Sequence, residues 1–150
     1  MTSTPGEPVI LPVRRAFRAL AATIVPAAAR MDERGWADVE ERIEAALRNR
    51  SPALRRQLCL LIQVLDWMPL LRYGRRFSAL GAEARAAVLR RLQRSPALVL
   101  RRGFWGLRTL VLLGYYGRPE ARRAIGYRAD PGGWEARRRA TAGEGKGDEA

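Results

Sequence analysis

The sequence contains no histidine, only one cysteine (Cys59) and only one lysine (Lys146) among its 150 residues. Without histidine, the chain itself supplies no Ser-His-Asp triad, no Cys-His pair and no imidazole ligand for a metal. With one cysteine, it supplies no intrachain disulfide and no thiolate zinc site. These absences predict a protein that is not an enzyme by itself. The length fits one domain, and a hydrophobic content of 47% argues against a disordered chain.

The charge is strongly positive and unevenly distributed. The chain has 28 basic and 15 acidic residues, a net charge of +13. Six of the acids lie between residues 32 and 44, whereas residues 45–129 hold eighteen arginines against three acids, a net +15. Such a field favours acidic partners, namely nucleic acid, anionic lipid or an acidic protein face. The alternative is an arginine excess from a GC-rich coding background, carried on a solvated surface.

The N-terminal part allows two interpretations. Arg14-Arg15 followed by the apolar stretch 19–29 resembles a twin-arginine export signal, and its three closing alanines resemble a cleavage site. However, Val13, Phe17, Leu20 and Ile24 recur at helical spacing and form one apolar stripe, which favours an ordinary helix of the folded domain. We therefore expect a cytoplasmic protein and keep export as the alternative. The longest apolar runs fall short of the roughly 20 residues that a bilayer requires.

Apolar periodicity and turn residues predict an all-α fold. Helices are expected over about 12–25, 35–48, from Ser51-Pro52 to a break at Pro69, over 82–94, and from Ser95-Pro96 to about residue 115. The pattern predicts a single compact bundle of about five main helices over residues 12–129, with a flexible leader (1–11) and a disordered tail (130–150). Because the last long helix is apolar on two faces, we expect it to be central in the bundle.

A short sequence motif is repeated at the starts of two predicted helices. The tetrapeptide Ser-Pro-Ala-Leu occurs at 51–54 and again at 95–98. The spacing suits HEAT-type helical repeats. Two copies are few for a solenoid, so the favoured interpretation is that two helices use the same capping chemistry.

Few residues point to chemistry. Asp66 lies inside an apolar run, where we expect a buried acid paired with an arginine rather than a catalytic group. Cys59 lies among leucines and is expected to be a core thiol. Gly103 and Gly106 fall within a helical pattern and are expected to allow close helix packing rather than phosphate contact.

Aromatic residues and arginines are interleaved in the last long helix. Arg101-Arg102-Gly103-Phe104-Trp105 and Tyr115-Tyr116-Gly117-Arg118 combine stacking and cationic groups, as single-strand nucleic-acid binders do. Helical spacing of the aromatics favours core packing instead. An arginine-rich helical nucleic-acid-binding protein therefore stays as the alternative function.

The order of several short motifs resembles the gluconate 2-dehydrogenase subunit 3 family. In that resemblance, the same helical module is fused ahead of the flavin domain in some long-chain alcohol oxidases of the glucose-methanol-choline (GMC) class. The matching pieces are Leu20-Ala21-Ala22-Thr23-Ile24-Val25-Pro26, then Phe77-Ser78-Ala79-Leu80, then Arg85 with Leu89, Leu92 and Ser95, and finally Ala124-Ile125-Gly126-Tyr127. The turn after Tyr127 and the position of Trp134 depart from the family pattern.

The resemblance implies an accessory role. Such a subunit has no cofactor of its own and packs on a separately encoded FAD-dependent GMC-type oxidoreductase, which it stabilises or matures. The expected contact residues are those of the last long helix and the following corner: Trp105, Tyr115, Tyr116, Ile125, Gly126 and Tyr127.

Overall fold

The computed structural model describes residues 8–124 and 126. The chain divides into two units, residues 1–118 and residues 119–150. The second unit contains α7 (Pro119–Ala124) and Gly126 among its described residues. The described residues of both units form helices and turns without any strand, which confirms the predicted all-α class. Residues 130–150, the predicted tail, lie outside the described residues.

Five helices of eleven or more residues build the first unit, as predicted. They are α1 (Arg14–Ile24), α2 (Glu33–Arg48), α3 (Pro52–Trp67), α5 (Ala82–Gln93) and α6 (Leu98–Tyr116). Shorter helical turns connect them: η1 (Leu11–Val13), η2 (Pro26–Arg30), α4 (Leu70–Tyr73) and η3 (Phe77–Ala79).

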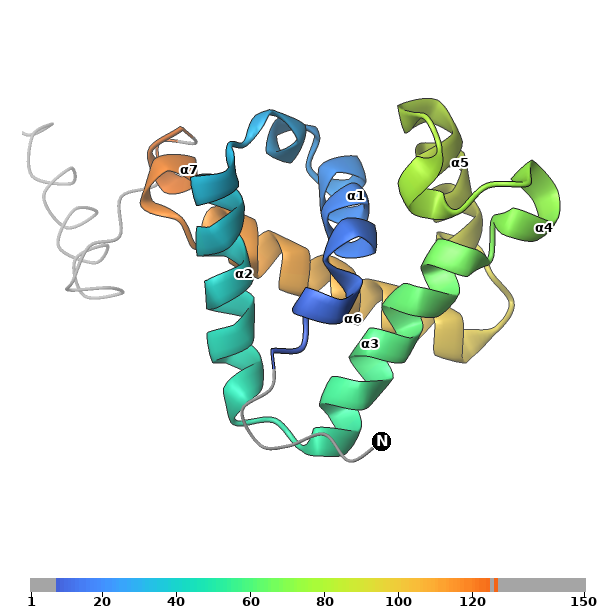
Figure 1. Ribbon diagram of the computed structural model, residues 1–150, viewed down its shortest axis with the longest axis horizontal. Helices are drawn as coiled ribbons and strands as arrows, with labels where there is room; N and C mark the ends of the chain where they lie inside the picture. The colour runs from blue at the N-terminus through green and yellow to red at the C-terminus, as the bar shows by residue number, and fades with distance from the viewer. Residues whose placement is uncertain (1–7, 125, 127–150) are drawn as a thin grey trace, which may run out of the picture. The chain divides into compact units, whose positions relative to one another are not determined.

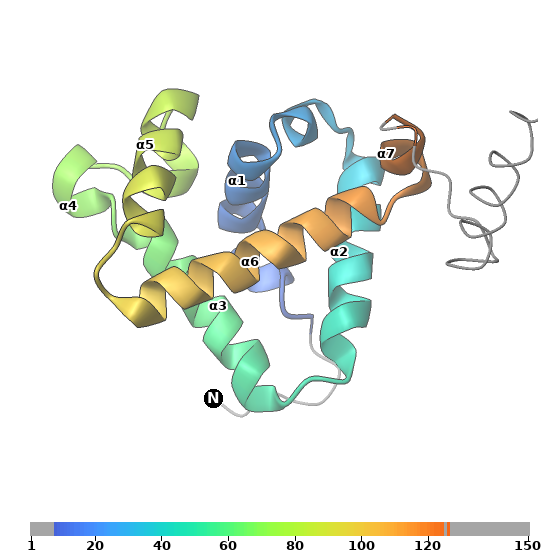
Figure 2. The same ribbon diagram turned by 180° about the vertical axis from the view of Figure 1, so that it is seen from behind.

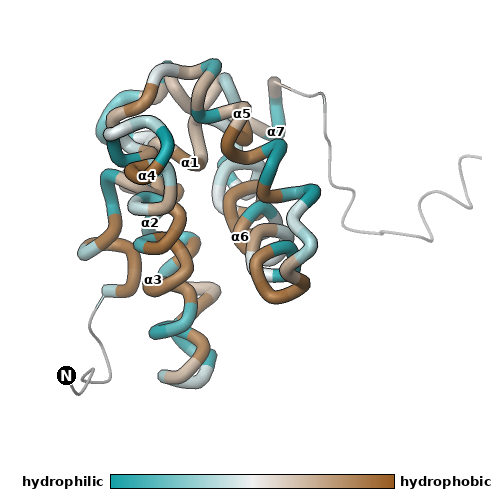
Figure 3. The backbone as a smooth tube through the Cα atoms, turned by 90° about the vertical axis from the view of Figure 1, so that its right-hand side faces the viewer, coloured by the Kyte–Doolittle hydropathy of each residue, from teal (hydrophilic) through white to brown (hydrophobic). Residues whose placement is uncertain are grey.

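Within the first unit, α2 and α3 diverge from a short loop and α1 lies between them (Figure 1). The helix α6 crosses one side of this group and contacts α1, α2, α3 and α5 (Figure 2). Phe17 of α1, Phe77 of η3 and Phe104 of α6 are fully buried and bring three distant segments into one core. Hydrophobic positions concentrate along α3 and α6 (Figure 3).

The predicted apolar stripes are mostly correct. The stripe of α2 is fully buried, and so are the three inward residues of α5: Trp36, Val39, Ile43 and Leu47, and Val88, Leu89 and Leu92. In α3, Ile62 and Leu65 are buried, whereas Leu54 at the other end is exposed. In α2, α3 and α5, the 3.6-residue period of apolar residues therefore locates the core face.

Side-chain capping decides where two of the helices, α2 and α3, begin. The Asp32 carboxylate accepts a 2.8 Å hydrogen bond from the amide of Gly35, so α2 starts two residues before the predicted Gly35. Ser51 caps α3 in the same way, by accepting from Leu54. Ser95 instead accepts from Ala97, only two residues on, and α6 begins at Leu98. The prediction that both Ser-Pro pairs start helices by the same capping chemistry is therefore wrong for Ser95, whose hydroxyl closes a turn.

The predicted flexible leader, residues 1–11, extends too far, because its last residues belong to the folded core. Val9 and Ile10 are buried in the core, and the amide of Ile10 donates a 2.7 Å hydrogen bond to the Glu44 carboxylate of α2. The carbonyl of Val9 accepts a hydrogen bond from the Cys59 thiol of α3. Apolar burial and two polar contacts thus fix a segment that its position alone marked as a leader.

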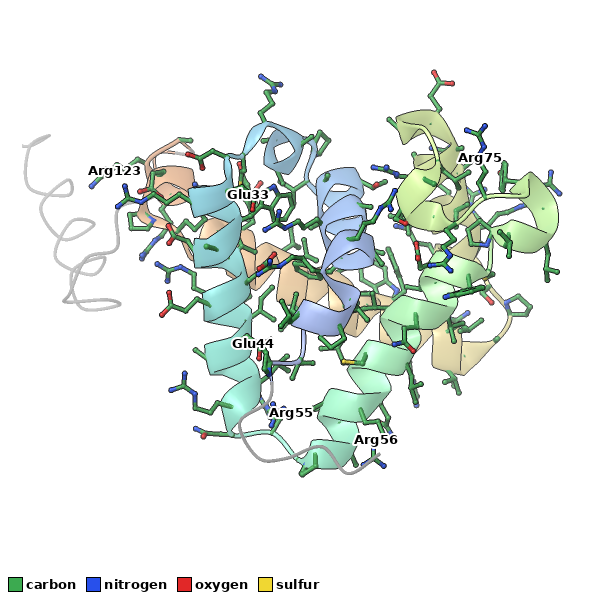
Figure 4. All side chains as sticks on the ribbon, in the orientation of Figure 1. Glu33, Glu44, Arg55, Arg56, Arg75 and Arg123 are labelled. Atoms are coloured by element: carbon green, nitrogen blue, oxygen red, sulfur yellow. The ribbon has the colours of Figure 1, made fainter. Side chains whose placement is uncertain are left out.

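Charged side chains join α1 to α2. The guanidinium of Arg18 donates to both carboxylate oxygens of Glu33 and, at 2.8 Å, to the buried carboxylate of Glu40. Arg14 pairs with the other oxygen of Glu40. Arg18 also lies 5.2 Å from the ring of Trp36. The acidic cluster of the sequence therefore has a structural role at this contact. Figure 4 labels Glu33, the first residue of α2, and Glu44, which lies one turn before the end of the helix at Arg48.

Candidate partner-binding surface

The helix α6 packs into the unit by one side only. Phe104, Leu107, Val111 and Gly114 are buried on that side. A Cβ added to Gly114 would lie 2.9 Å from Ile43 of α2, and one added to Gly103 would lie 2.9 Å from Leu61 of α3. These two glycines therefore allow close helix packing, as predicted for Gly103.

The opposite side of α6 is exposed and largely apolar, with Arg102 and Thr109 interspersed. We define the outer face of α6 by Leu98, Trp105, Leu113 and Tyr116, which are between 37% and 55% exposed. Their spacing keeps them on one side of the helix over about 27 Å, at a rise of about 1.5 Å per residue. The prediction that α6 is central in the bundle is right for its contacts, which reach the four other long helices of the first unit, and wrong for its outer face, which is exposed. No described helix of the first unit covers this second apolar stripe.

Gly106 lies on this exposed side, and a Cβ there would meet nothing within 4 Å. The predicted packing role is thus wrong for Gly106. A glycine inside a helix costs about 1 kcal/mol relative to alanine, and here no contact within the first unit offsets that cost. The bare backbone beside Trp105 leaves room for a close approach by another molecule.

The predicted contact residues separate into three groups. Trp105 and Tyr116 belong to the outer face, with the guanidinium of Arg108 lying 5.1 Å from the Trp105 ring. Tyr115 is half-buried, packs against the core and meets Tyr116 edge to face with ring centroids 5.1 Å apart. The core-packing interpretation of the aromatics is therefore right for Phe104 and wrong for Trp105.

The remaining predicted contact residues follow α7 in the second unit. Gly126 is exposed and has a φ of 67°, and its amide donates a hydrogen bond to the carbonyl of Arg123. This left-handed conformation is the usual way in which glycine ends a helix. Ile125 and Tyr127 lie outside the described residues.

A second exposed apolar surface escaped the sequence analysis. On α3 and α4 it comprises Leu60, Val64, Trp67 and Leu71, of which Leu71 is 98% exposed. The guanidinium of Arg76 covers the Trp67 ring at 3.9 Å. The sequence does contain a sign of this surface, because α3 carries further apolar residues outside its predicted core stripe.

Asp66 has a backbone partner rather than an arginine. It is buried, and its carboxylate accepts a 2.8 Å hydrogen bond from the amide of Ser78. Arg85 donates to the carbonyls of Phe77 and Ser78 from the other side. The prediction that Asp66 is buried is therefore confirmed, whereas the prediction that it pairs with an arginine is wrong. Together the two side chains hold the Phe77-Ser78-Ala79 turn against α3 and α5, which is a structural role.

Cys59 is a structural thiol rather than a nucleophile. It is half-buried and donates its hydrogen bond to the carbonyl of Val9 at 3.0 Å. Burial raises the pKa of the thiol, and the nearby Glu44 carboxylate acts in the same direction. Both effects favour the unreactive thiol form at neutral pH.

Comparison with known proteins gives the family. The sequence pattern of gluconate 2-dehydrogenase subunit 3 matches residues 14–132. The chain belongs to this family. Membership suggests a subunit of a dehydrogenase complex. Searches among curated proteins and among solved structures each gave no match.

Residues 8–124 and 126 contain no group of three or more acidic or cysteine side chains able to hold a metal ion. None of the helices in this part of the chain is long and apolar enough to cross a membrane. The matched range includes the turn held by Asp66 and Arg85 and the whole of α6, so the candidate surface belongs to the family's module.

Proposed function

We propose that the chain is a non-catalytic accessory subunit, which binds a separately encoded FAD-dependent GMC-type oxidoreductase and stabilises or matures it. The observation that carries the proposal is the outer face of α6, in a chain of the subunit 3 family. The flavin and the substrate belong to the partner. In this proposal the chain contributes surface and no reacting group.

The chemistry of the outer face suits a permanent subunit contact. Trp and Tyr are the side chains that contribute most often to binding energy at interfaces, and Trp105 and Tyr116 supply one of each. Leu98 and Leu113 extend the apolar area along the helix. Full burial of one such side chain contributes roughly 1.5–3 kcal/mol, so covering what is still exposed on four residues amounts to several kcal/mol. Ile125, Gly126 and Tyr127 are proposed as further contacts of the same partner.

Co-expression tests the proposal. The chain is produced with a GMC-type flavoprotein from the same genome, and the complex is purified through a tag on the flavoprotein. We expect co-purification, with more soluble and more flavin-loaded enzyme than in cells without this chain. A flavoprotein that is equally soluble, active and flavin-loaded alone contradicts the proposal.

Matched variants locate the contact. Leu113→Glu places a charge on the outer face of α6, whereas Leu60→Glu places one on α3 at nearly the same exposure, 55% against 52%. Trp105→Ala and Trp67→Ala form a second pair, at 49% and 51% exposure. Co-purification should be lost for the α6 variants and kept for the α3 variants, because only the former lie at the proposed contact. The reverse pattern would assign binding to the α3 surface.

A further inference from the structure

A groove of about 750 Å³ lies between α4, α5 and the start of α6. This volume lies within the range of about 300–1,000 Å³ that is typical of binding pockets. Its floor is apolar, with Met68, Val88, Leu92 and Leu100, all of which belong to the core or pack against it. The floor is therefore held by the fold rather than by loose side chains.

Four arginines line the same groove: Arg72, Arg90, Arg91 and Arg94. All four are exposed, and no acidic residue lines the groove with them. The ion pairs that join α1 to α2, namely Arg14–Glu40, Arg18–Glu33 and Arg18–Glu40, involve none of these four guanidinium groups. Arg72 lies 5.9 Å from the ring of Tyr73. The groove thus combines a rigid apolar floor with four positive charges that no carboxylate of the described chain compensates.

We propose that this groove binds a segment of a partner polypeptide in which acidic residues flank an apolar side chain. One carboxylate forms paired hydrogen bonds with one guanidinium group, so a ligand with a single acidic group leaves most of the four unused. Several carboxylates on one peptide match all of them. An apolar side chain between them fills the floor, which a purely ionic ligand would leave wet.

The inference is independent of docking through the outer face of α6. Leu100 of the groove and Trp105 of the outer face are five residues apart, which places them about 140° apart around the helix. An acidic segment on any partner polypeptide meets the requirement. The test uses this chain alone, so its failure leaves the proposed accessory function unaffected.

Fluorescence anisotropy with a designed probe tests the groove. The probe is a labelled peptide with leucines at helical spacing and glutamates elsewhere, titrated with the purified full chain at low and at physiological salt. We expect saturable binding that Arg72→Gln/Arg91→Gln weakens by about tenfold or more, because charge-assisted hydrogen bonds are lost. The control, Arg30→Gln/Arg56→Gln, removes the same two charges elsewhere and should leave the affinity nearly unchanged.

A filling variant and two altered probes separate specific binding from general attraction. Ala87 lines the groove, so Ala87→Trp should obstruct it and reduce the affinity while all arginines remain. A probe with serines in place of the leucines should bind at least about tenfold more weakly, because the apolar floor is left unfilled. Circular dichroism checks that each variant is folded.

Three results would overturn the inference. The first is equal binding of the two probes, and the second is equal loss in the two arginine pairs, since both indicate unspecific charge attraction. The third is a duplex oligonucleotide that binds more tightly than the peptide and loses affinity in the same groove variants. That result would assign the arginines to nucleic acid instead.

Discussion

The buried carboxylate of Asp66 accepts a hydrogen bond from the backbone amide of Ser78, 2.8 Å away. We expect Asp66→Ala to lower the free energy of unfolding by about 1–3 kcal/mol, because the partly buried amide of Ser78 is left without this partner. Gln63→Ala, on an exposed position of α3, should change it by less than about 0.5 kcal/mol. Denaturant titration measures both values. Equal midpoints for the two variants would show that the Ser78 contact contributes nothing.

Two glycines of α6 should respond in opposite directions to the same substitution. Gly114→Ala places a Cβ 2.9 Å from Ile43 and should destabilise the protein. Gly106→Ala meets open space and should stabilise it by up to about 1 kcal/mol, because alanine is the better helix former. Thermal melts of the isolated chain measure both. If the outer face of α6 binds a partner, Gly106→Ala should also weaken co-purification, and an unchanged complex would show that the partner does not approach this backbone.

Acid should remove the contribution of Glu33. The hydrogen bonds from Arg18 lower the pKa of the Glu33 carboxyl below its ordinary value of 4.5. A carboxyl whose pKa is depressed in the folded state stabilises the fold above its unfolded pKa, and the contribution disappears as the pH falls through the folded pKa. Glu33→Gln should therefore lower Tm at about pH 7, and the difference should shrink progressively as the pH falls below the ordinary carboxyl pKa of 4.5. A Tm difference that persists in acid would contradict this assignment.

We propose that α1 is retained in the folded protein, which then stays in the cytoplasm. Phe17 is fully buried, and Ile24 packs against the core from the same helix. Phe17→Asp should therefore prevent folding, since an unpaired charge would enter the core. The intact mass of the protein isolated from its native cells should include residues 14–29. A mass that lacks them, or recovery from the periplasm, would support the export alternative.

The sequence predicted the helices and the inner side of most of them, because burial imposes a 3.6-residue period. The stripe from Trp36 to Leu47 of α2 is the clearest case. The same reasoning failed on α6, where Phe104 and Trp105 are both apolar and only one is buried. A stripe that meets another helix and a stripe that meets a separate molecule have the same composition. The tertiary arrangement alone tells them apart.

Hydrogen bonds between residues far apart in the chain could not be predicted from the sequence either. Asp66 is held by a backbone amide, and backbone amides carry no residue-specific signal. The Ile10 amide and the Glu44 carboxylate are thirty-four residues apart, and neither belongs to a motif. The groove lined by Arg72 and Arg91 draws on three separate segments. Charge composition predicted that a basic surface exists, while its position depends on how α4, α5 and α6 converge.

The contacts that α6 makes with α1, α2, α3 and α5 have a consequence for how binding should be detected. A partner that covers only the outer face of α6 would stabilise the folded state of every helix that packs against the buried side of α6. Amide hydrogen exchange should then slow in α2 and α5, far from any intermolecular contact. A map of slowed exchange would therefore mark the cooperative unit, and site-directed variants would be needed to outline the footprint of the partner.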